Sequence, residues 1–102
     1  MDVDLEKDVE KHLKSQISKR GGLSLKWTST VRGVPDQIIC LPNGDTIFVE
    51  VKKPDGQTRK SQDKMIRTLQ DLHQTVFVCY TKMQVDTLVR DLERIGCFNR
   101  GS

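Results

Sequence analysis

The chain has 102 residues, of which 35% are hydrophobic and 30% charged, and its formal net charge is +3. This length predicts one domain over residues 1–102 with a modest core that would gain from association with a second copy. No stretch approaches the roughly 18 apolar residues of a membrane span and no signal peptide opens the chain, so we expect a cytoplasmic protein without a membrane partner, whose mild basic charge permits nucleic-acid binding.

A helix is predicted from about Asp4 to Arg20, because apolar residues recur there every four positions. Gly21-Gly22 ends this helix. In residues 23–27, apolar and polar side chains alternate, which predicts a strand with Trp27 in the core rather than on a stacking platform for bases. The apolar positions of the helix are Leu5, Val9, Leu13 and Ile17.

Two further strands are predicted over residues 37–41 and 45–51, joined as a hairpin. Pro54–Gly56 then breaks the chain, and a helix follows over residues 61–73 with Ser61 as its N-cap. The nearly continuous apolar run at residues 75–80 predicts a buried strand. The apolar residues expected on one face of the helix over 61–73 are Met65, Ile66, Leu69 and Leu72.

The last helix is predicted from Met83 to Ile95, followed by Cys97 and Phe98, which we expect to be exposed. All three cysteines of the chain are expected to be reduced thiols, because their number is odd and their spacing wide. The residues of this helix expected to face inward are Val85, Leu88, Val89, Leu92 and Ile95.

The predicted order is therefore helix, three strands, helix, strand, helix. Tight turns favour antiparallel pairing of the first strands, and a right-handed crossover over residues 46–80 makes the fourth strand parallel to its neighbour. The expected fold class is α/β, with a small mixed sheet flanked by helices.

The turn of the hairpin sets which side chains face each other. Pro42 and Asn43 suit the central positions of a type I turn, and Gly44 suits the left-handed position that completes a three-residue loop. In this register Asp36 faces Glu50, and strand alternation places Lys52 on the same face.

Two directly opposed carboxylates repel each other, so this pair is a poor structural device. A divalent cation removes the objection, because Mg²⁺ binds through one or two carboxylates, water and phosphate. The backbone carbonyl of Val51 could contribute a further ligand, and Lys52 could orient or deprotonate a water or steady the charge on a phosphate. The alternative is that Asp36 belongs to the loop and that Glu50 and Lys52 form a solvated pair at a strand end.

Two glutamates of the first helix, Glu6 and Glu10, fall within its apolar stripe one turn apart. A glutamate there is costly unless it is paired or bound to a metal. A rim position is the favoured interpretation for Glu6, and a functional role is favoured for Glu10.

The segments Pro35-Asp36 and "EVK" at residues 50–52 resemble the PD-(D/E)XK nuclease signature, and the element order resembles that superfamily's restriction-endonuclease-like core. The surrounding segments "LKWTS" (25–29), "RGVPDQIICLPNG" (32–44), "FVEVKKPDG" (48–56) and "SQ" (61–62) resemble the virus-type replication-repair nuclease (VRR-NUC) family over about residues 5–80. Chains of this size resemble its stand-alone bacteriophage members.

The resemblance implies a metal-dependent phosphodiesterase that acts on DNA. Carried over residue by residue, it implies that Glu10, Asp36 and Glu50 are metal-binding acids, with Glu6 as a rival to Glu10. It further implies catalytic roles for Lys52 and for Gln62, which could bond a metal-bound water or a DNA phosphate. One departure is Gln37, which stands where the family often has arginine.

The candidate DNA contacts surround this site. Lys26 matches a recurrent family lysine, although a solvated strand lysine explains it equally, and Arg32 precedes the acid and could touch the scissile strand. The others cluster around residues 54–56 and the next helix start, where they could track a DNA backbone or simply be solvated. They are Lys53, Arg59, Lys60 and Lys64.

The leading hypothesis is a Mg²⁺- or Mn²⁺-dependent, structure-selective DNA endonuclease. A two-fold homodimer would match the symmetry of a four-way junction, so we expect it to resolve Holliday-type junctions. The alternatives are a non-catalytic DNA-binding module that keeps the fold, and a sequence-specific restriction-type endonuclease, for which the chain leaves little base-reading surface.

Overall fold

The computed structural model describes residues 4–52 and 60–100. The predicted break at residues 54–56 lies outside them. In the described part of the chain, no helix has both the length and the apolar character that a membrane crossing requires. The elements follow the predicted order: α1 (Glu6–Lys19), β1 (Leu23–Lys26), β2 (Gln37–Cys40), β3 (Thr46–Val51), α2 (Lys60–Asp71), β4 (Val76–Cys79) and α3 (Lys82–Arg94).

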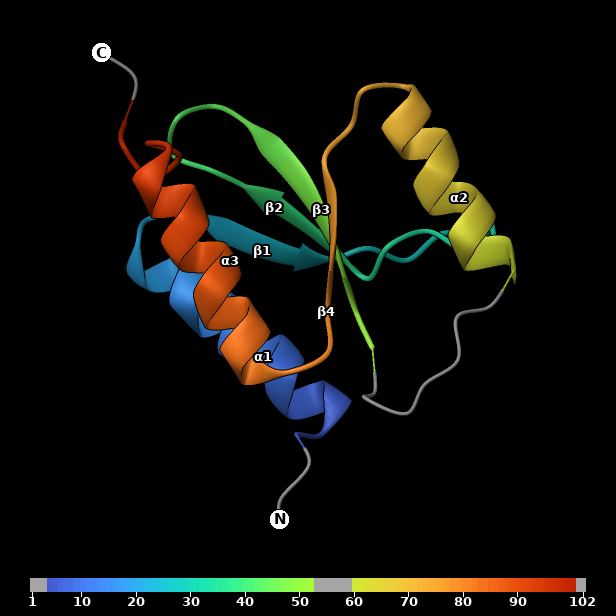
Figure 1. The fold of residues 1–102 in the computed structure, drawn as a ribbon, viewed down its shortest axis with the longest axis horizontal. Helices are drawn as coiled ribbons and strands as arrows, with labels where there is room; N and C mark the ends of the chain where they lie inside the picture. Colours follow the sequence, from blue (N-terminus) through green and yellow to red (C-terminus); the bar gives the residue numbers. More distant parts are fainter. Residues whose placement is uncertain (1–3, 53–59, 101–102) are drawn as a thin grey trace.

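The four strands form one mixed sheet in the order β1-β2-β3-β4. β1 pairs antiparallel with β2, β2 pairs antiparallel with β3, and β4 lies parallel to β3, as predicted. Helices α1 and α3 lie together on one side of the sheet, and α2 lies apart from them beyond β4 (Figure 1). This is the α/β architecture, with helices flanking a small mixed sheet, that the sequence predicts.

The hydrophobic core lies between the sheet and the pair α1 and α3. Strand alternation sends every second side chain of β3 into it, so Ile47, Val49 and Val51 are buried there. Glu50 consequently points to the opposite face, toward α2. The core consists of Val9, Leu13, Ile17, Ile39, Leu41, Ile47, Val49, Val51, Cys79, Val85, Leu88, Val89, Leu92 and Cys97.

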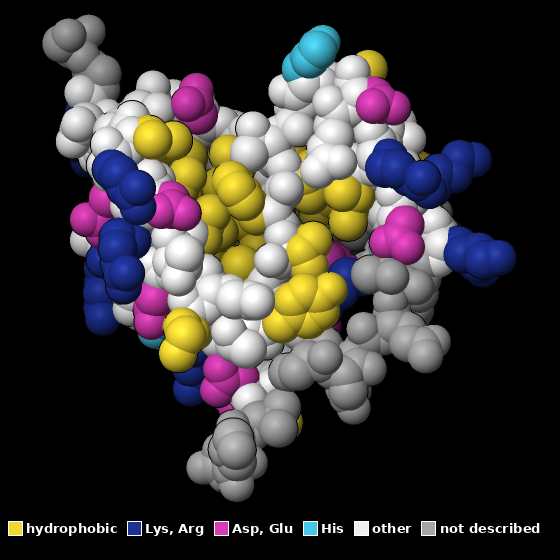
Figure 2. Space-filling view, viewed as in Figure 1, with side chains coloured by type: hydrophobic (Ala, Val, Ile, Leu, Met, Phe, Trp, Pro, Cys, Tyr) yellow, Lys and Arg dark blue, Asp and Glu magenta, His cyan; other side chains and the backbone are white. Residues whose placement is uncertain are grey.

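The prediction of a buried fourth strand is wrong. β4 is an edge strand, in which Cys79 is buried while Val78 is exposed. The neighbouring α2 has no buried residue, and Leu72 is 64% exposed just beyond its end. Figure 2 shows hydrophobic side chains on the surface between α2 and the body of the molecule. The sheet thus has one well-packed face and one partly covered face.

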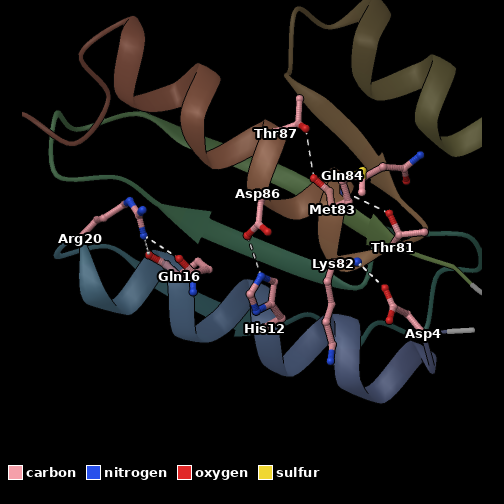
Figure 3. A network of polar contacts seen from close by, with 10 residues as sticks. All are labelled: Asp4, His12, Gln16, Arg20, Thr81, Lys82, Met83, Gln84, Asp86 and Thr87. Carbon is pink, nitrogen blue, oxygen red and sulfur yellow. Dashed lines mark hydrogen bonds and ion pairs between the residues drawn. The ribbon is translucent and has the colours of Figure 1, made fainter. Parts of the chain in front are cut away.

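Polar contacts link α1 to α3 along the rim of the core (Figure 3). The His12 ring lies 2.7 Å from a carboxylate oxygen of Asp86, and the backbone N–H of Lys82 donates to Asp4 at 2.8 Å. Thr81 caps α3, because its hydroxyl accepts from the backbone N–H of Gln84. These contacts hold the helix pair in place behind the sheet.

In β1 a polar side chain faces the core. Ser24 is buried, while Leu23 and Leu25 are exposed. The Ser24 hydroxyl donates to the Gln37 side chain at 3.2 Å, which satisfies it on the α1 side of the sheet. Trp27, just beyond β1, is half-buried with its ring centroid 5.4 Å from that of Phe48.

Three predictions at helix ends are wrong. Ser61 lies inside the first turn of α2, which begins at Lys60, so it is not the N-cap. Ile95 is 73% exposed, because α3 ends at Arg94 and the chain turns away there. That turn folds Cys97 back into the core and packs Phe98 against it, so neither is the exposed residue predicted.

Candidate active site

The hairpin turn brings the two acids of the signature together. The backbone N–H of Gly44 donates to the Leu41 carbonyl at 2.9 Å, and that of Leu41 donates to the Asp45 carbonyl at 2.8 Å, which closes the predicted three-residue loop. Gln37 pairs with Val49 across the strands. One step further along the same register, Asp36 stands opposite Glu50.

Reciprocal backbone contacts hold the two carboxylates in place. The backbone N–H of Asp36 donates to Glu50 Oε1 at 3.0 Å, and the backbone N–H of Val51 donates to Asp36 Oδ2 at 3.1 Å. Glu50 is only 2% exposed, and Asp36 is half-buried. The chain therefore fixes two acids side by side where water has limited access.

Lys52 and Gln62 complete the cluster. Lys52 Nζ donates to Gln62 Oε1 at 2.8 Å and lies 3.9 Å from Glu50 Oε2, and the Gln62 amide donates to the same glutamate. Lys52 comes from the end of β3, whereas Gln62 comes from the first turn of α2. That turn lies beside the carboxylates, and the carboxamide of Gln62 links Lys52 with Glu50.

Burial raises the pKa of Glu50 from 4.5 to about 7, and the negative charge of Asp36 adds to the rise. The positive charge of Lys52 opposes the rise without cancelling it. Near neutral pH this carboxyl is therefore poised between its two protonation states. A carboxyl kept so far from its usual range by burial and a second acid is typical of a functional site.

A cleft of about 620 Å³ opens beside the cluster and includes Asp36 and Gln62 in its wall. Two basic residues proposed as DNA contacts, Lys26 and Arg32, line it too. The loop between β1 and β2 forms much of the rest. Its other lining residues are Trp27, Thr28, Ser29, Val31, Gly33, Val34 and Ser61.

Gly33, a residue of this loop, packs closely against the start of α2. Its φ is +87°, and a Cβ placed there would lie 2.3 Å from the Ser61 carbonyl oxygen. Glycine is required both by the left-handed backbone and by the close approach of two segments of the chain, one at Gly33 and one at Ser61. The contact fixes the first turn of α2, and hence Gln62, against the segment that carries Asp36.

Gly33→Ala should destabilise the protein by about 2–5 kcal/mol, the sum of backbone strain and overpacking, and should lower any cleavage rate by displacing Gln62. Gly44→Ala is the matched control, because Gly44 also has a positive φ, +99°, but open space around its Cβ position. It should cost only about 1–2 kcal/mol and leave cleavage unchanged. Denaturant unfolding and a cleavage assay measure both, and equal effects of the two changes would contradict this account.

Glu10 bonds to two residues other than Asp36 and Glu50. Its carboxylate accepts from Gln37 Nε2 at 2.8 Å and from Lys26 Nζ at 3.4 Å, on the α1 side of the sheet. Among the described contacts, none joins it to Asp36 or Glu50. Glu6, its rival, is half-buried in the first turn of α1.

The buried pair formed by Ser24 and Gln37 was not predicted. The alternation within β1 gives no sign of it, and the partner lies 13 residues away. Gln37, noted only as a departure from the family pattern, proves to orient Glu10.

The remaining residues that were predicted to contact DNA fall into two groups. Lys60 and Lys64 are exposed on α2. Lys53 and Arg59 lie outside the described residues.

The chemistry of the donor set fits a hard divalent cation. Within residues 4–52 and 60–100, no group of three or more His, Cys, Asp or Glu side chains forms a closed cage. Two opposed carboxylates match a cation such as Mg²⁺, which completes its shell with water and phosphate oxygens. Asp36 and Glu50 would hold it, and the positive charge would offset the repulsion that raises the pKa of Glu50.

Comparisons with known proteins identify the family to which the chain belongs. The VRR-NUC domain model matches residues 4–83. A solved structure described as a VRR_NUC domain superposes with a TM-score of 0.77 at 32% identity, covering 83% of this chain and 94% of that one. "Putative nuclease p44" of Acyrthosiphon pisum secondary endosymbiont phage 1 is 52% identical over 50 residues, which are 48% of this chain and 54% of that relative, so the match spans about half of each. The chain belongs to the VRR-NUC family of nuclease domains, with its PD-(D/E)XK-like fold.

Proposed function

We propose that this protein is a Mg²⁺- or Mn²⁺-dependent endodeoxyribonuclease that cuts branched DNA, in particular four-way junctions, as a homodimer in the cytoplasm of the cell that makes it. The observation that carries the proposal is the cluster of Asp36, Glu50, Lys52 and Gln62 at the wall of a cleft lined by Lys26 and Arg32.

The roles of the side chains follow from their positions. Asp36 and Glu50 would hold the cation, which when bound would supply Lewis-acid polarisation of the phosphodiester. Lys52 lies next to the carboxylates, where its ammonium stabilises the negative charge that develops on the phosphate or takes part in activating the attacking water. Gln62 holds Lys52 in place and presents its amide to water or phosphate. Water attacks phosphorus, the bond to the leaving oxygen breaks, and that oxygen takes up a proton.

The cleft favours a polyanionic backbone as substrate. Lys26 and Arg32 line it and are exposed, so both side chains can reach phosphates at little desolvation cost, although Lys26 also pairs with Glu10. Contacts of this kind position a backbone and carry no base sequence. This supports selection of DNA by structure over selection by sequence.

The face of α2 and β4 favours association with a second copy. Leu72 and Val78 are exposed there, and Met65, Ile66 and Leu69 are only half-buried. An apolar surface of this kind on a small chain gains stability when a two-fold partner covers it. Two copies then present two sites, matching the symmetry of a four-way junction.

The test is single-turnover cleavage of a labelled four-way junction and of a linear duplex of the same sequences, in Mg²⁺, in Mn²⁺ and in EDTA. We expect two symmetric cuts in the junction, little cutting of the duplex, and none in EDTA. Binding without cutting in any metal would favour the non-catalytic alternative. Cutting of duplex at one short sequence would favour the restriction-type alternative.

Light scattering tests the dimer independently. The unmodified chain should have twice the mass of the 11.7-kDa monomer. Leu72→Glu should convert it to a monomer and abolish the paired cuts, since it places a charge in the apolar surface. Leu23→Glu is the matched control and should leave the dimer intact, because Leu23 is also an exposed leucine (51%, against 64% for Leu72) but lies on β1 at the other edge of the sheet. A parent protein that is monomeric would refute the dimer and leave the nuclease chemistry standing.

A further inference from the structure

Three lysines form a stripe along α1 that the active site does not use. Lys7, Lys11 and Lys14 are all exposed. At 100° per residue they fall within an arc of about 60°, and they span about 10 Å of the helix. None of them takes part in an ion pair with another described residue. We call these three residues the α1 lysine stripe.

The stripe lies on the β1 side of α1, not on its α3 side. A hollow of about 410 Å³ is lined by its three lysines together with Asp8 and Glu10. A second hollow of about 300 Å³ extends from Lys11 and Lys14 to residues of β1. The surface beside the stripe is thus concave and runs along the edge strand of the sheet.

Lys26 connects the stripe to the catalytic cleft. It lines the cleft together with Asp36, and its ammonium pairs with Glu10, which lines the hollow of the stripe. Glu10 is already bonded to Gln37 and Lys26, so its charge is partly offset within its own network. A basic path therefore leads from the scissile site past Lys26 to the lysines of α1.

The outer side of α3 shows no such excess of positive charge. Its basic residues Lys82, Arg90 and Arg94 alternate with Asp86, Asp91 and Glu93. All three acids form ion pairs, with His12, Arg94 and Arg20 respectively. Among the described residues of α1 and α3, only the β1 side of α1 therefore offers a row of unpaired cations that continues the path from the cleft. The partner that fits such a row is the phosphate backbone of a nucleic acid.

We infer that the α1 lysine stripe binds the phosphate backbone of a DNA arm that leaves the catalytic cleft past Lys26. The inference rests on the proposed function, because it identifies how the same site would hold the rest of its substrate. A branched substrate supplies such an arm next to the cut. Each lysine contributes charge without reading bases, so the stripe adds affinity and orientation and no sequence preference.

The experiment measures the salt dependence of binding to a labelled four-way junction in EDTA by fluorescence anisotropy. Each phosphate contact contributes about 0.9 to the slope of log Kd against log salt, so the triple variant Lys7→Gln, Lys11→Gln, Lys14→Gln should lose up to about 2.7. Between 200 and 50 mM salt, the unmodified protein should therefore gain up to about 40-fold more affinity than the triple variant.

Two controls separate charge position from total charge and from folding. The triple variant Lys19→Gln, Lys82→Gln, Arg90→Gln removes the same charge from exposed residues on the α3 side and should keep the parent slope. Lys7→Arg, Lys11→Arg, Lys14→Arg keeps the charge and should keep the slope as well. All these side chains are exposed, so thermal unfolding should stay close to that of the parent.

The outcomes are distinct. A slope lowered by the stripe variant and by neither control supports the inference. An unchanged slope, or one lowered equally by the α3-side variant, overturns it while the nuclease proposal stands. A parent protein that binds no DNA overturns the inference and the proposed function together.

Discussion

Asp36→Asn should lower the rate of DNA cleavage by about 10³-fold or more while the protein stays folded. Asparagine keeps an oxygen that can accept the backbone N–H of Val51, so the local structure survives. It removes one of the two charges that would hold the cation, and the loss of Lewis-acid stabilisation is worth several kcal/mol in the transition state. Single-turnover cleavage at saturating protein measures the effect.

Lys52→Ala should lower the same rate by about 10²- to 10³-fold, the effect typical of removing one charge-stabilising donor. Lys52→Arg should recover part of the loss, because it restores the charge with a different shape. Asp45→Asn and Lys19→Ala are the controls, since each removes the same charge from an exposed position away from the cluster. Undiminished cutting by either Asp36→Asn or Lys52→Ala would exclude the proposed chemistry.

Without divalent metal, the free energy of unfolding should fall as the pH rises from about 4.5 to about 7. The pKa of Glu50 is about 7 in the folded protein and 4.5 in the unfolded chain, so the folded state holds the extra proton across this window. Stability therefore falls with pH, and the difference of about 2.5 pH units corresponds to as much as about 3 kcal/mol. Denaturant unfolding in EDTA from pH 4 to 8.5 measures it.

Glu50→Gln should flatten this part of the pH profile, because it removes the titrating group and keeps its shape. Comparison of the two proteins subtracts the contribution of every other titrating group. Mg²⁺ should stabilise the parent more at pH 8 than at pH 5.5, since the cation favours the ionised carboxylate. A parent profile that matches Glu50→Gln, or equal stabilisation by Mg²⁺ at both pH values, would show that Glu50 is not part of a metal site.

The opposition of Asp36 and Glu50 could be predicted from sequence because local turn chemistry determines it. Pro42, Asn43 and Gly44 specify the loop length, the loop length specifies the register, and the register specifies which acids meet. The strand order was predictable for similar reasons, since tight turns and a single crossover leave few topologies. The place of Gln62 came from the family resemblance, and the crossover explains why it reaches the carboxylates.

What escaped prediction depends on contacts between distant segments. Ser24 faces inward, and its leucine neighbours face outward, because the Gln37 side chain lies on the α1 face of the sheet and accepts a hydrogen bond from Ser24. No pattern within β1 reveals this contact. Cys97 is buried because its N–H bonds the Leu92 carbonyl and its own carbonyl accepts from Asn43 in the hairpin turn. An apolar stripe likewise cannot say whether Glu10 meets another acid or, as found, Gln37.

The most direct test of the central claim is a calorimetric titration of Mn²⁺ into the protein, its Asp36→Asn variant and its Glu10→Gln variant at pH 8. The claim is that Asp36 and Glu50 together hold the catalytic cation. It predicts a saturable site in the parent and loss of that site in Asp36→Asn. When the titration is repeated near pH 7, binding should release a proton that Glu50 has already lost at pH 8. Retained binding by Glu10→Gln would assign the helix acid to a role outside the metal site. Equal Mn²⁺ binding by the parent and by Asp36→Asn would contradict the claim.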